Sequence, residues 1–190
     1  MQSLENSEGL LRCIACWTLS RFTSWIVRQS QDHPEVMKEY LTAVLKLMME
    51  DNKKVQEASC SALSKVCNDG VDVIENFITD VVQVIKIVSS KYSKKDTIKY
   101  LYDAIGSLAF NVKPEVVQSD AVEPVLLEVL VEKWNESHFN DVEATVLVEC
   151  TDSVISVLGA HASKYAKFFI ERIIYLINYY IEARKVFSFY

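Results

Sequence analysis

The sequence predicts an all-α chain built from repeated helix pairs, and three observations support that prediction. Glycine and proline contribute only 4 and 3 of the 190 residues, about 4% together against an average near 12%. A sheet protein needs a tight turn about every 8–12 residues and would use more of both. Apolar residues instead recur at the i, i+3, i+4, i+7 spacing of a helix face, and the helices so defined repeat along the chain.

The first four helices have recognisable boundaries. Ser30–His33 interrupts the first apolar pattern, and Pro34 opens the second helix from its first turn, where a missing N–H costs nothing. Asn52 can cap the start of the third helix, and Gly70 can take the left-handed conformation at its end. The expected ranges are 10–29, 34–50, 53–67 and 72–91.

The last four helices are bounded in the same way. Capping boxes are expected at Ser93-x-x-Asp96 and Asn140-x-x-Glu143, and Gly159 should end the helix that the second box opens. The expected ranges are 95–112, 120–135, 140–158 and 163–183.

Alternate helices are copies of one another. Leu19, Leu63, Leu108 and Val154 occupy similar settings, at spacings of 44, 45 and 46 residues. Two antiparallel helices in about 40–47 residues are typical of HEAT and armadillo solenoids, whose repeats bury their apolar faces against neighbouring repeats. We therefore expect an α-solenoid, with residues 1–190 forming one run of about four HEAT repeats. The run should be incomplete at both ends and part of a longer array, because the pattern shows no polar capping repeat.

Charge and composition disfavour several functions. Asp and Glu number 26 against 20 Lys and Arg, so the chain carries a net charge of -6 and should repel nucleic acid. No apolar run is long enough to span a membrane. The odd number of cysteines and the lack of a signal peptide favour reduced thiols.

No catalytic or metal-binding motif is recognised. Cys13-x-x-Cys16 is at most half of a zinc site, and the three histidines are far apart in the sequence. The chain has no Gly-rich phosphate loop and no nucleophile elbow. We therefore expect no cofactor, no metal and no enzymatic activity.

One binding face is expected on the first, third, fifth and seventh helices, because one helix of each pair lines the concave surface of a solenoid. On each of these helices, residues at i, i+3 and i+7 form a stripe. The stripes place aromatic and apolar residues at one end of the face and carboxylates at the other. An extended peptide with a hydrophobic or aromatic residue and a basic residue would complement this face. The stripes are Ile14, Trp17 and Arg21; Ala58, Ser61 and Lys65; Asp103, Gly106 and Phe110, with Ser107 beside them; and Glu149, Asp152 and Ser156.

Several motifs resemble the transportins, a family of karyopherin-beta nuclear import receptors. The motifs keep the order and spacing of the family from about residue 11 to residue 183; they are CWTLSRF at 16–22, NKKVQEA at 52–58, LYDAIGSLA at 101–109, KWN at 133–135 and EC at 149–150. The resemblance implies HEAT repeats, binding of proline-tyrosine nuclear localisation signals on the concave face, and shuttling between cytoplasm and nucleus. In a full-length receptor it also implies binding of Ran-GTP and Phe-Gly nucleoporins.

The resemblance also implies roles for individual residues. Ile14, Trp17 and Arg21 match the family's contacts to the proline-tyrosine end of the signal, and Asp103, Ser107 and Glu149 match positions that meet its upstream part. Three residues depart from the family. Lys65 replaces a threonine, Asn68 an acid and Phe110 an aspartate, and all three reduce the negative charge of the face, which favours hydrophobic upstream signals over basic ones.

Other interpretations remain open. Trp17 could be a core residue, and Trp25 and Trp134 are expected in the core or between helices. Asp103 and Glu149 could be solvated carboxylates without a binding role. The alternative function is a HEAT-repeat scaffold or regulatory subunit for protein-protein assembly, and a helical enzyme is the third. Exposure of Trp17 would favour the receptor, whereas burial between helices would favour the scaffold.

Overall fold

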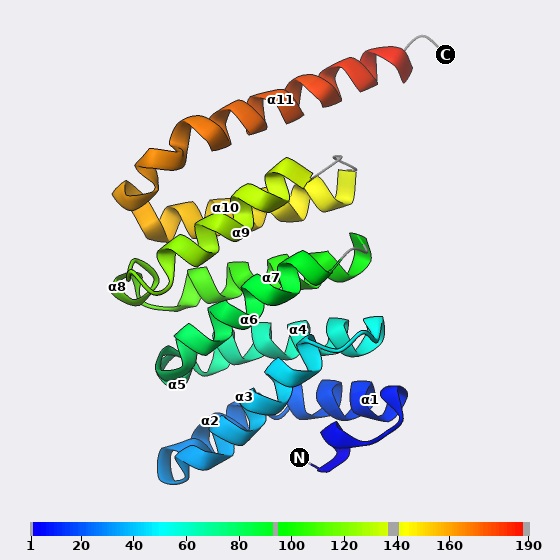
Figure 1. Ribbon diagram of the computed structural model, residues 1–190, viewed down its shortest axis with the longest axis vertical. Coiled ribbons are helices and arrows are strands. Elements are labelled where there is room, and N and C mark those ends of the chain that lie inside the picture. Colours follow the sequence, from blue (N-terminus) through cyan, green and yellow to red (C-terminus); the bar gives the residue numbers. More distant parts are fainter. Residues whose placement is uncertain (1, 93–94, 137–140, 188–190) are drawn as a thin grey trace.

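The computed structural model describes residues 2–92, 95–136 and 141–187, and these form an all-α stack without a strand (Figure 1). The predicted α-solenoid is confirmed. The elements are η1 (Gln2–Glu5), α1 (Gly9–Ser20), α2 (Thr23–Asp32), α3 (Pro34–Met48), α4 (Lys53–Asp69), α5 (Val71–Ile74), η2 (Glu75–Phe77), α6 (Ile78–Lys91), α7 (Lys95–Asn111), α8 (Pro114–Val117), α9 (Glu123–Glu136), α10 (Asp141–Leu158), η3 (Gly159–Ala162) and α11 (Ser163–Phe187).

The long helices form two layers (Figure 1). One layer is the row α1, α4, α7 and α10, in which each helix contacts the next. The other is the row α3, α6 and α9, again with neighbours in contact. The prediction that alternate helices share one layer is therefore confirmed. Leu63, Leu108 and Val154 are fully buried between the layers, whereas the equivalent Leu19 is half-buried, because α1 has a neighbour in its row on one side only.

Two predicted helices are bent. The range 10–29 is divided at Arg21 and Phe22 into α1 and α2, and the range 72–91 is divided at Phe77. Phe22 and Phe77 have similar conformations, with φ/ψ of -103/13 and -118/7. At the first bend the Ser20 hydroxyl donates to the Trp17 carbonyl at 2.7 Å and the Thr23 hydroxyl to the Ser20 carbonyl at 2.8 Å. Hydroxyl groups that bond back to the helix in this way often accompany bends, although Ser59 and Thr151 do the same within the uninterrupted helices α4 and α10.

The predicted caps have mixed outcomes. Asn52 accepts hydrogen bonds from the N–H groups of Lys54 and Val55, as expected. Gly159 has a φ of 54° and follows the end of α10. The prediction for Gly70 is wrong, because its φ is -131°, outside the left-handed region. The Gly70 N–H instead donates to the Val66 carbonyl. Both predicted capping boxes lie outside the described residues, at Ser93 and Asn140.

The three tryptophans have different surroundings. Trp134 is fully buried, as expected, and its indole Nε1–H donates to the Thr151 hydroxyl at 2.8 Å. The prediction that Trp25 packs in the core or between helices is wrong, because its side chain is 53% exposed. The bend at Phe22 rotates α2 so that Thr23, Ile26 and Ser30 face the core and Trp25 lies to one side of them.

Polar contacts join residues that are about one repeat apart in the sequence. The Tyr92 hydroxyl donates to the Met48 carbonyl at 2.7 Å, across 44 residues. The Ser64 and Ser107 hydroxyls are 2.8 Å apart across 43 residues. Each repeat is therefore fixed to the next through specific hydrogen bonds in addition to apolar packing.

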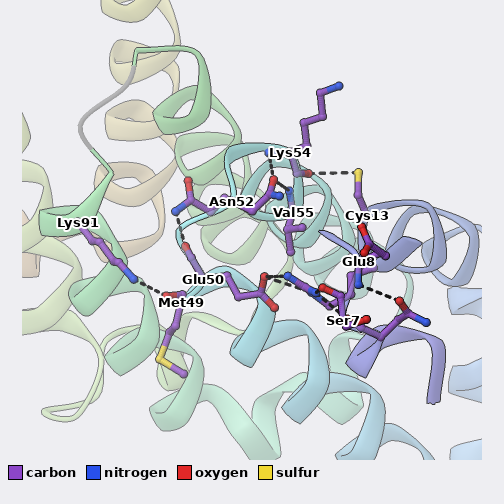
Figure 2. A network of polar contacts seen from close by, with 12 residues as sticks. Ser7, Glu8, Cys13, Met49, Glu50, Asn52, Lys54, Val55 and Lys91 are labelled. Carbon is purple, nitrogen blue, oxygen red and sulfur yellow. Dashed lines mark hydrogen bonds and ion pairs between the residues drawn. The ribbon is translucent and has the colours of Figure 1, made fainter. Parts of the chain in front are cut away.

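Figure 2 shows further polar contacts between neighbouring repeats, around the turn between α3 and α4. Glu50 in this turn pairs with Arg12 of α1 at 2.6 Å. On the other side, Lys91 at the end of α6 donates to the Met49 carbonyl. The turn thus binds both the preceding and the following helix pair.

The end helices expose apolar side chains. Phe169 and Leu176 of α11 are buried, but six large apolar residues between positions 170 and 181 are about half exposed, so one face of this helix is partly uncovered. At the opposite end of the stack, α1 and α2 also expose apolar side chains. The exposed residues are Ile170, Ile174, Tyr175, Ile177, Tyr179 and Ile181 on α11, and Leu10, Leu11, Ile14, Trp17, Phe22 and Trp25 at the other end. Within the described ranges, no helix has the length and apolarity needed to cross a membrane.

A buried carboxylate fixes the start of α11. Glu123 of α9 is 8% exposed and lies 2.9 Å from His161 Nδ1 and 3.2 Å from Lys164 Nζ. Burial raises the pKa of Glu123, but the bonds from His161 and Lys164 outweigh it, so the pKa lies below its ordinary value of 4.5. A lowered carboxylate pKa stabilises the fold above pH 4.5, and this contribution is lost as the pH falls through the lower, folded-state pKa.

We therefore expect acid to loosen α11 through Glu123. In the wild-type chain, hydrogen exchange in α11 should accelerate as the pH falls below 4.5, beyond the intrinsic change in exchange rate. Glu123→Gln should exchange faster already at pH 6, with a smaller further effect of acid. Glu171→Gln is a matched control, because Glu171 is 65% exposed and pairs only weakly with Lys167. An equal pH response in wild type and Glu123→Gln would contradict the prediction.

Candidate functional site

An exposed tryptophan and an arginine form one end of the candidate face. Trp17 is 54% exposed and Ile14 51% exposed, and both lie on the open side of α1. Arg21 is the residue immediately after α1, four residues from Trp17, and its guanidinium carbon lies 5.0 Å from the centre of the Trp17 ring. This is a cation–π contact, and it holds the indole and the guanidinium side by side in solvent.

A first cavity of about 420 Å³ adjoins Trp17, between α1 and α4. Ile14 and Trp17 form one wall, Ala58 and Ser61 of α4 form another, and Tyr100 of α7 closes the far side. The cavity combines apolar rings with a few polar groups, as peptide-binding pockets do. Its lining is Cys13, Ile14, Trp17, Lys54, Glu57, Ala58, Ser61 and Tyr100.

A second cavity of about 260 Å³ lies between α7 and α10, beside the end of α4. It brings together Asp103, Ser107 and Glu149, the three residues expected at the carboxylate end of the face. The Ser107 hydroxyl is bonded to Ser64, and the Asn111 amide donates to Asn68 Oδ1 at 2.7 Å. The full lining is Asn68, Tyr102, Asp103, Gly106, Ser107, Phe110, Asn111, Val146, Glu149, Cys150 and Ser153.

The charges of this face are unevenly neutralised. Lys65, one of the predicted stripe residues, pairs with Asp69 at 2.8 Å, and Asp69 also accepts a hydrogen bond from Ser24. Burial raises the pKa of Asp69, but these two bonds outweigh it and lower the pKa. By contrast, Asp103 and Glu149 are exposed and make no ion pair with any residue that the structure describes. The second cavity therefore has a negative rim.

Sequence reasoning missed some lining residues and included others that line neither cavity. Tyr100 precedes Asp103 by three residues and could have been found from the same helical spacing. Cys13 precedes Ile14 and packs its thiol against the Lys54 carbonyl at 3.3 Å. Lys65, Asp152 and Ser156, by contrast, line neither cavity, and Arg21 reaches the first one only through its contact with Trp17.

The four buried cysteines lie in surroundings that disfavour the thiolate. All five are free, and Cys16, Cys60, Cys67 and Cys150 are buried. Burial raises the pKa of Cys16 and of Cys60 to about 12. Raised pKa values leave the nucleophilic thiolate scarce at neutral pH. Among the residues that the structure describes, no cluster of three His, Cys, Asp or Glu could hold a metal ion.

Gly106 leaves space on the wall of the second cavity. A Cβ added to it would meet Ser153 Oγ at 3.7 Å and Cys150 Cα at 3.9 Å, both ordinary van der Waals distances. Alanine is favoured over glycine in a helix interior by about 0.5–1 kcal/mol.

We therefore expect Gly106→Ala to raise the free energy of unfolding by about that amount, measured by urea denaturation. Gly70→Ala is the contrasting control, because its Cβ would lie 2.8 Å from Val27, and it should destabilise. A loss of stability in Gly106→Ala would show that α7 and α10 pack more tightly than described.

Comparison with known proteins identifies clear relatives. No family model matches the chain. It is 33% identical over 183 residues to transportin-1 of Homo sapiens and of Mus musculus, an alignment that covers 94% of this chain and 19% of each relative. It is 32% identical over 167 residues to importin subunit beta-2 of Saccharomyces cerevisiae, covering 84% of this chain and 17% of that protein. The chain thus spans about a fifth of the length of these relatives.

Proposed function

The chain belongs to the transportin family of karyopherin-beta proteins, and on that premise we propose that it is a cargo-binding segment of a nuclear import receptor. It binds proline-tyrosine nuclear localisation signals along the concave side of the α1, α4, α7 and α10 layer. The observation that carries this proposal is the exposed pair of Trp17 and Arg21 beside the first cavity, with the carboxylate-rimmed second cavity in the same helix layer.

The first cavity suits the proline-tyrosine end of the signal. The flat face of Trp17 offers an apolar surface on which a proline or a tyrosine ring packs. Ile14 extends this surface, and Arg21 can bond to the tyrosine hydroxyl or stack on its ring. Because Arg21 already lies against Trp17, little side-chain freedom is lost when a ring joins them.

The second cavity suits the upstream part of the same signal. Asp103 and Glu149 supply unpaired carboxylates, and Ser107 supplies a hydroxyl. An extended peptide that runs from the first cavity past Tyr100 meets this second cavity further along the layer. Two separated subsites on one chain raise affinity because the second contact forms intramolecularly.

The remaining partners are proposed for the receptor of which this segment would form part. Such a segment comprises about four HEAT repeats. The receptor would shuttle between cytoplasm and nucleus and would bind Ran-GTP and Phe-Gly nucleoporins elsewhere in its array. In this proposal the chain acts by binding alone, without catalysis, nucleic acid or membrane.

A HEAT-repeat assembly scaffold remains the second candidate function. The apolar faces of α11 and of α1 and α2 would serve a scaffold as well as a receptor. Trp17 favours the receptor through its neighbours, since it lines the first cavity and has the Arg21 guanidinium 5.0 Å from its ring centre, an arrangement that suits a bound aromatic ring. Peptide binding is therefore the better-supported function.

A titration with labelled peptides tests the proposal. We expect the chain to bind a peptide with a basic upstream part and a carboxyl-terminal proline-tyrosine, and to bind at least tenfold more weakly when both end residues are alanine. Asp103→Asn should weaken binding of the basic peptide, and the loss should shrink as salt rises, because salt screens exposed charges. Equal affinity for the proline-tyrosine and alanine peptides would overturn the proposed function.

A further inference from the structure

Phe110 occupies an unusual position on the binding layer. Its side chain is 82% exposed, although it lies on α7, which has α4 on one side and α10 on the other. The exposed apolar residues of α1, α2 and α11 lie at the ends of the stack, where a helix layer stops. Phe110 lies in the middle of it, at the rim of the second cavity, so the ends of the stack do not explain its exposure.

The ring of Phe110 shares this cavity with two carboxylates. Asp103 precedes Phe110 by seven residues, two turns of the same helix face, and Glu149 faces them from α10. Neither carboxylate has an ion pair within the described ranges. Lys65, the stripe lysine on neighbouring α4, is held by Asp69 at 2.8 Å and so does not compensate them.

We propose that Phe110 determines specificity in the second cavity, where its ring stacks on the guanidinium of an arginine in the upstream part of the signal while Asp103 and Glu149 accept that group's hydrogen bonds. This inference rests on the proposed function. It reverses the preference for hydrophobic upstream signals that was expected from the sequence, because Asp103 and Glu149 make no ion pair within the described ranges.

The chemistry of the cavity favours arginine over the alternatives. The guanidinium is planar and weakly hydrated, so it stacks on an aromatic face and still bonds to carboxylates, whereas the lysine ammonium is compact and strongly hydrated. An apolar side chain could pack on Phe110, but it would take water from Asp103 and Glu149 without replacing the lost hydrogen bonds. Of the three side chains, only arginine can stack on the ring and form directed hydrogen bonds to a carboxylate with the same group.

The test compares three peptides that differ at one upstream residue, arginine, lysine or leucine, and share an intact proline-tyrosine end. Affinities are measured for the 190-residue chain and for Phe110→Ala and Phe110→Leu. Ile87→Ala on α6 is the matched control, since Ile87 is 54% exposed in the other helix layer. The large exposure of Phe110 means that these variants should keep the helicity and melting temperature of the wild type.

We expect the arginine peptide to bind about two- to fivefold more tightly than the lysine peptide, the range of an exposed cation–π contact. Both Phe110 variants should remove that preference while leaving the affinity of the lysine peptide nearly unchanged. The leucine peptide should bind most weakly, and the control variant should behave as wild type.

The contrary outcomes separate this inference from the proposed function. If leucine binds as tightly as arginine, the cavity is an apolar subsite and the arginine assignment is wrong. If arginine and lysine bind equally and the Phe110 variants change nothing, Phe110 is not a specificity residue, although loss of binding on replacing the proline-tyrosine end would still uphold the proposed function. If no peptide depends on its proline-tyrosine end, both proposals fall.

Discussion

Trp134→Ala is expected to destabilise the fold by about 3–5 kcal/mol, the cost of replacing a buried aromatic residue by alanine. Trp134 has no exposed surface in the core of the stack, and its Nε1–H donates to Thr151 Oγ1, which in turn donates to the Leu147 carbonyl at 2.7 Å. Removing the indole leaves a cavity between α9 and α10 and takes a donor from the buried Thr151 hydroxyl. A loss of this size is a large part of the 5–15 kcal/mol that stabilises a typical domain.

The matched control for this prediction is Trp25→Ala. Trp25 is 53% exposed and projects from α2 beside the core-facing residues, so its removal should change stability by less than about 1 kcal/mol. Chemical denaturation followed by circular dichroism at 222 nm measures both variants under one set of conditions. Comparable losses for the two tryptophans would contradict the surroundings described for them.

Trp25 and Trp134 also show where sequence reasoning stops. Spacing identifies a residue as part of an apolar stripe, but it cannot tell whether the stripe faces another helix or solvent. The side that α2 turns to the core depends on the bend at Phe22, where the hydroxyl groups of Ser20 and Thr23 bond back to the helix. Such hydroxyls often point to solvent instead, so the bend was not predictable from the residue types.

The sequence predicted which residues of the candidate site lie together better than it predicted their ion pairs and exposure. Asp103, Ser107 and Glu149 meet in one cavity because the repeat of 44–46 residues places equivalent positions side by side on α7 and α10. The same period correctly placed Ile14 and Trp17 beside Ala58 and Ser61. The pairing of Lys65 with Asp69 was missed, because a lysine has several neighbours within reach and only packing selects one. Phe110 was expected on the same face, but its 82% exposure depends on how α7 packs between α4 and α10, which residue spacing does not give.

Trp17→Ala is expected to weaken the binding of a proline-tyrosine peptide by about 2 kcal/mol or more, roughly 30-fold, as truncation of a hot-spot aromatic residue does. The indole lines the first cavity together with Ile14, and its removal also frees Arg21, whose guanidinium lies 5.0 Å from the ring. Because 54% of Trp17 is exposed, melting temperature and helicity should change little.

Trp25→Ala is the control here as well, because it removes an equally exposed indole that lines neither cavity and should leave the affinity unchanged. Titration calorimetry with one peptide measures all three tryptophan variants, with the folded fraction of each taken from its denaturation curve. If Trp17→Ala unfolds the chain while the affinity per folded molecule stays constant, Trp17 is a packing residue and the site assignment fails. If Trp25→Ala weakens binding as strongly, the peptide lies across the end of the stack formed by α1 and α2. Only a loss confined to Trp17→Ala, with stability preserved, places the proline-tyrosine end against the first cavity.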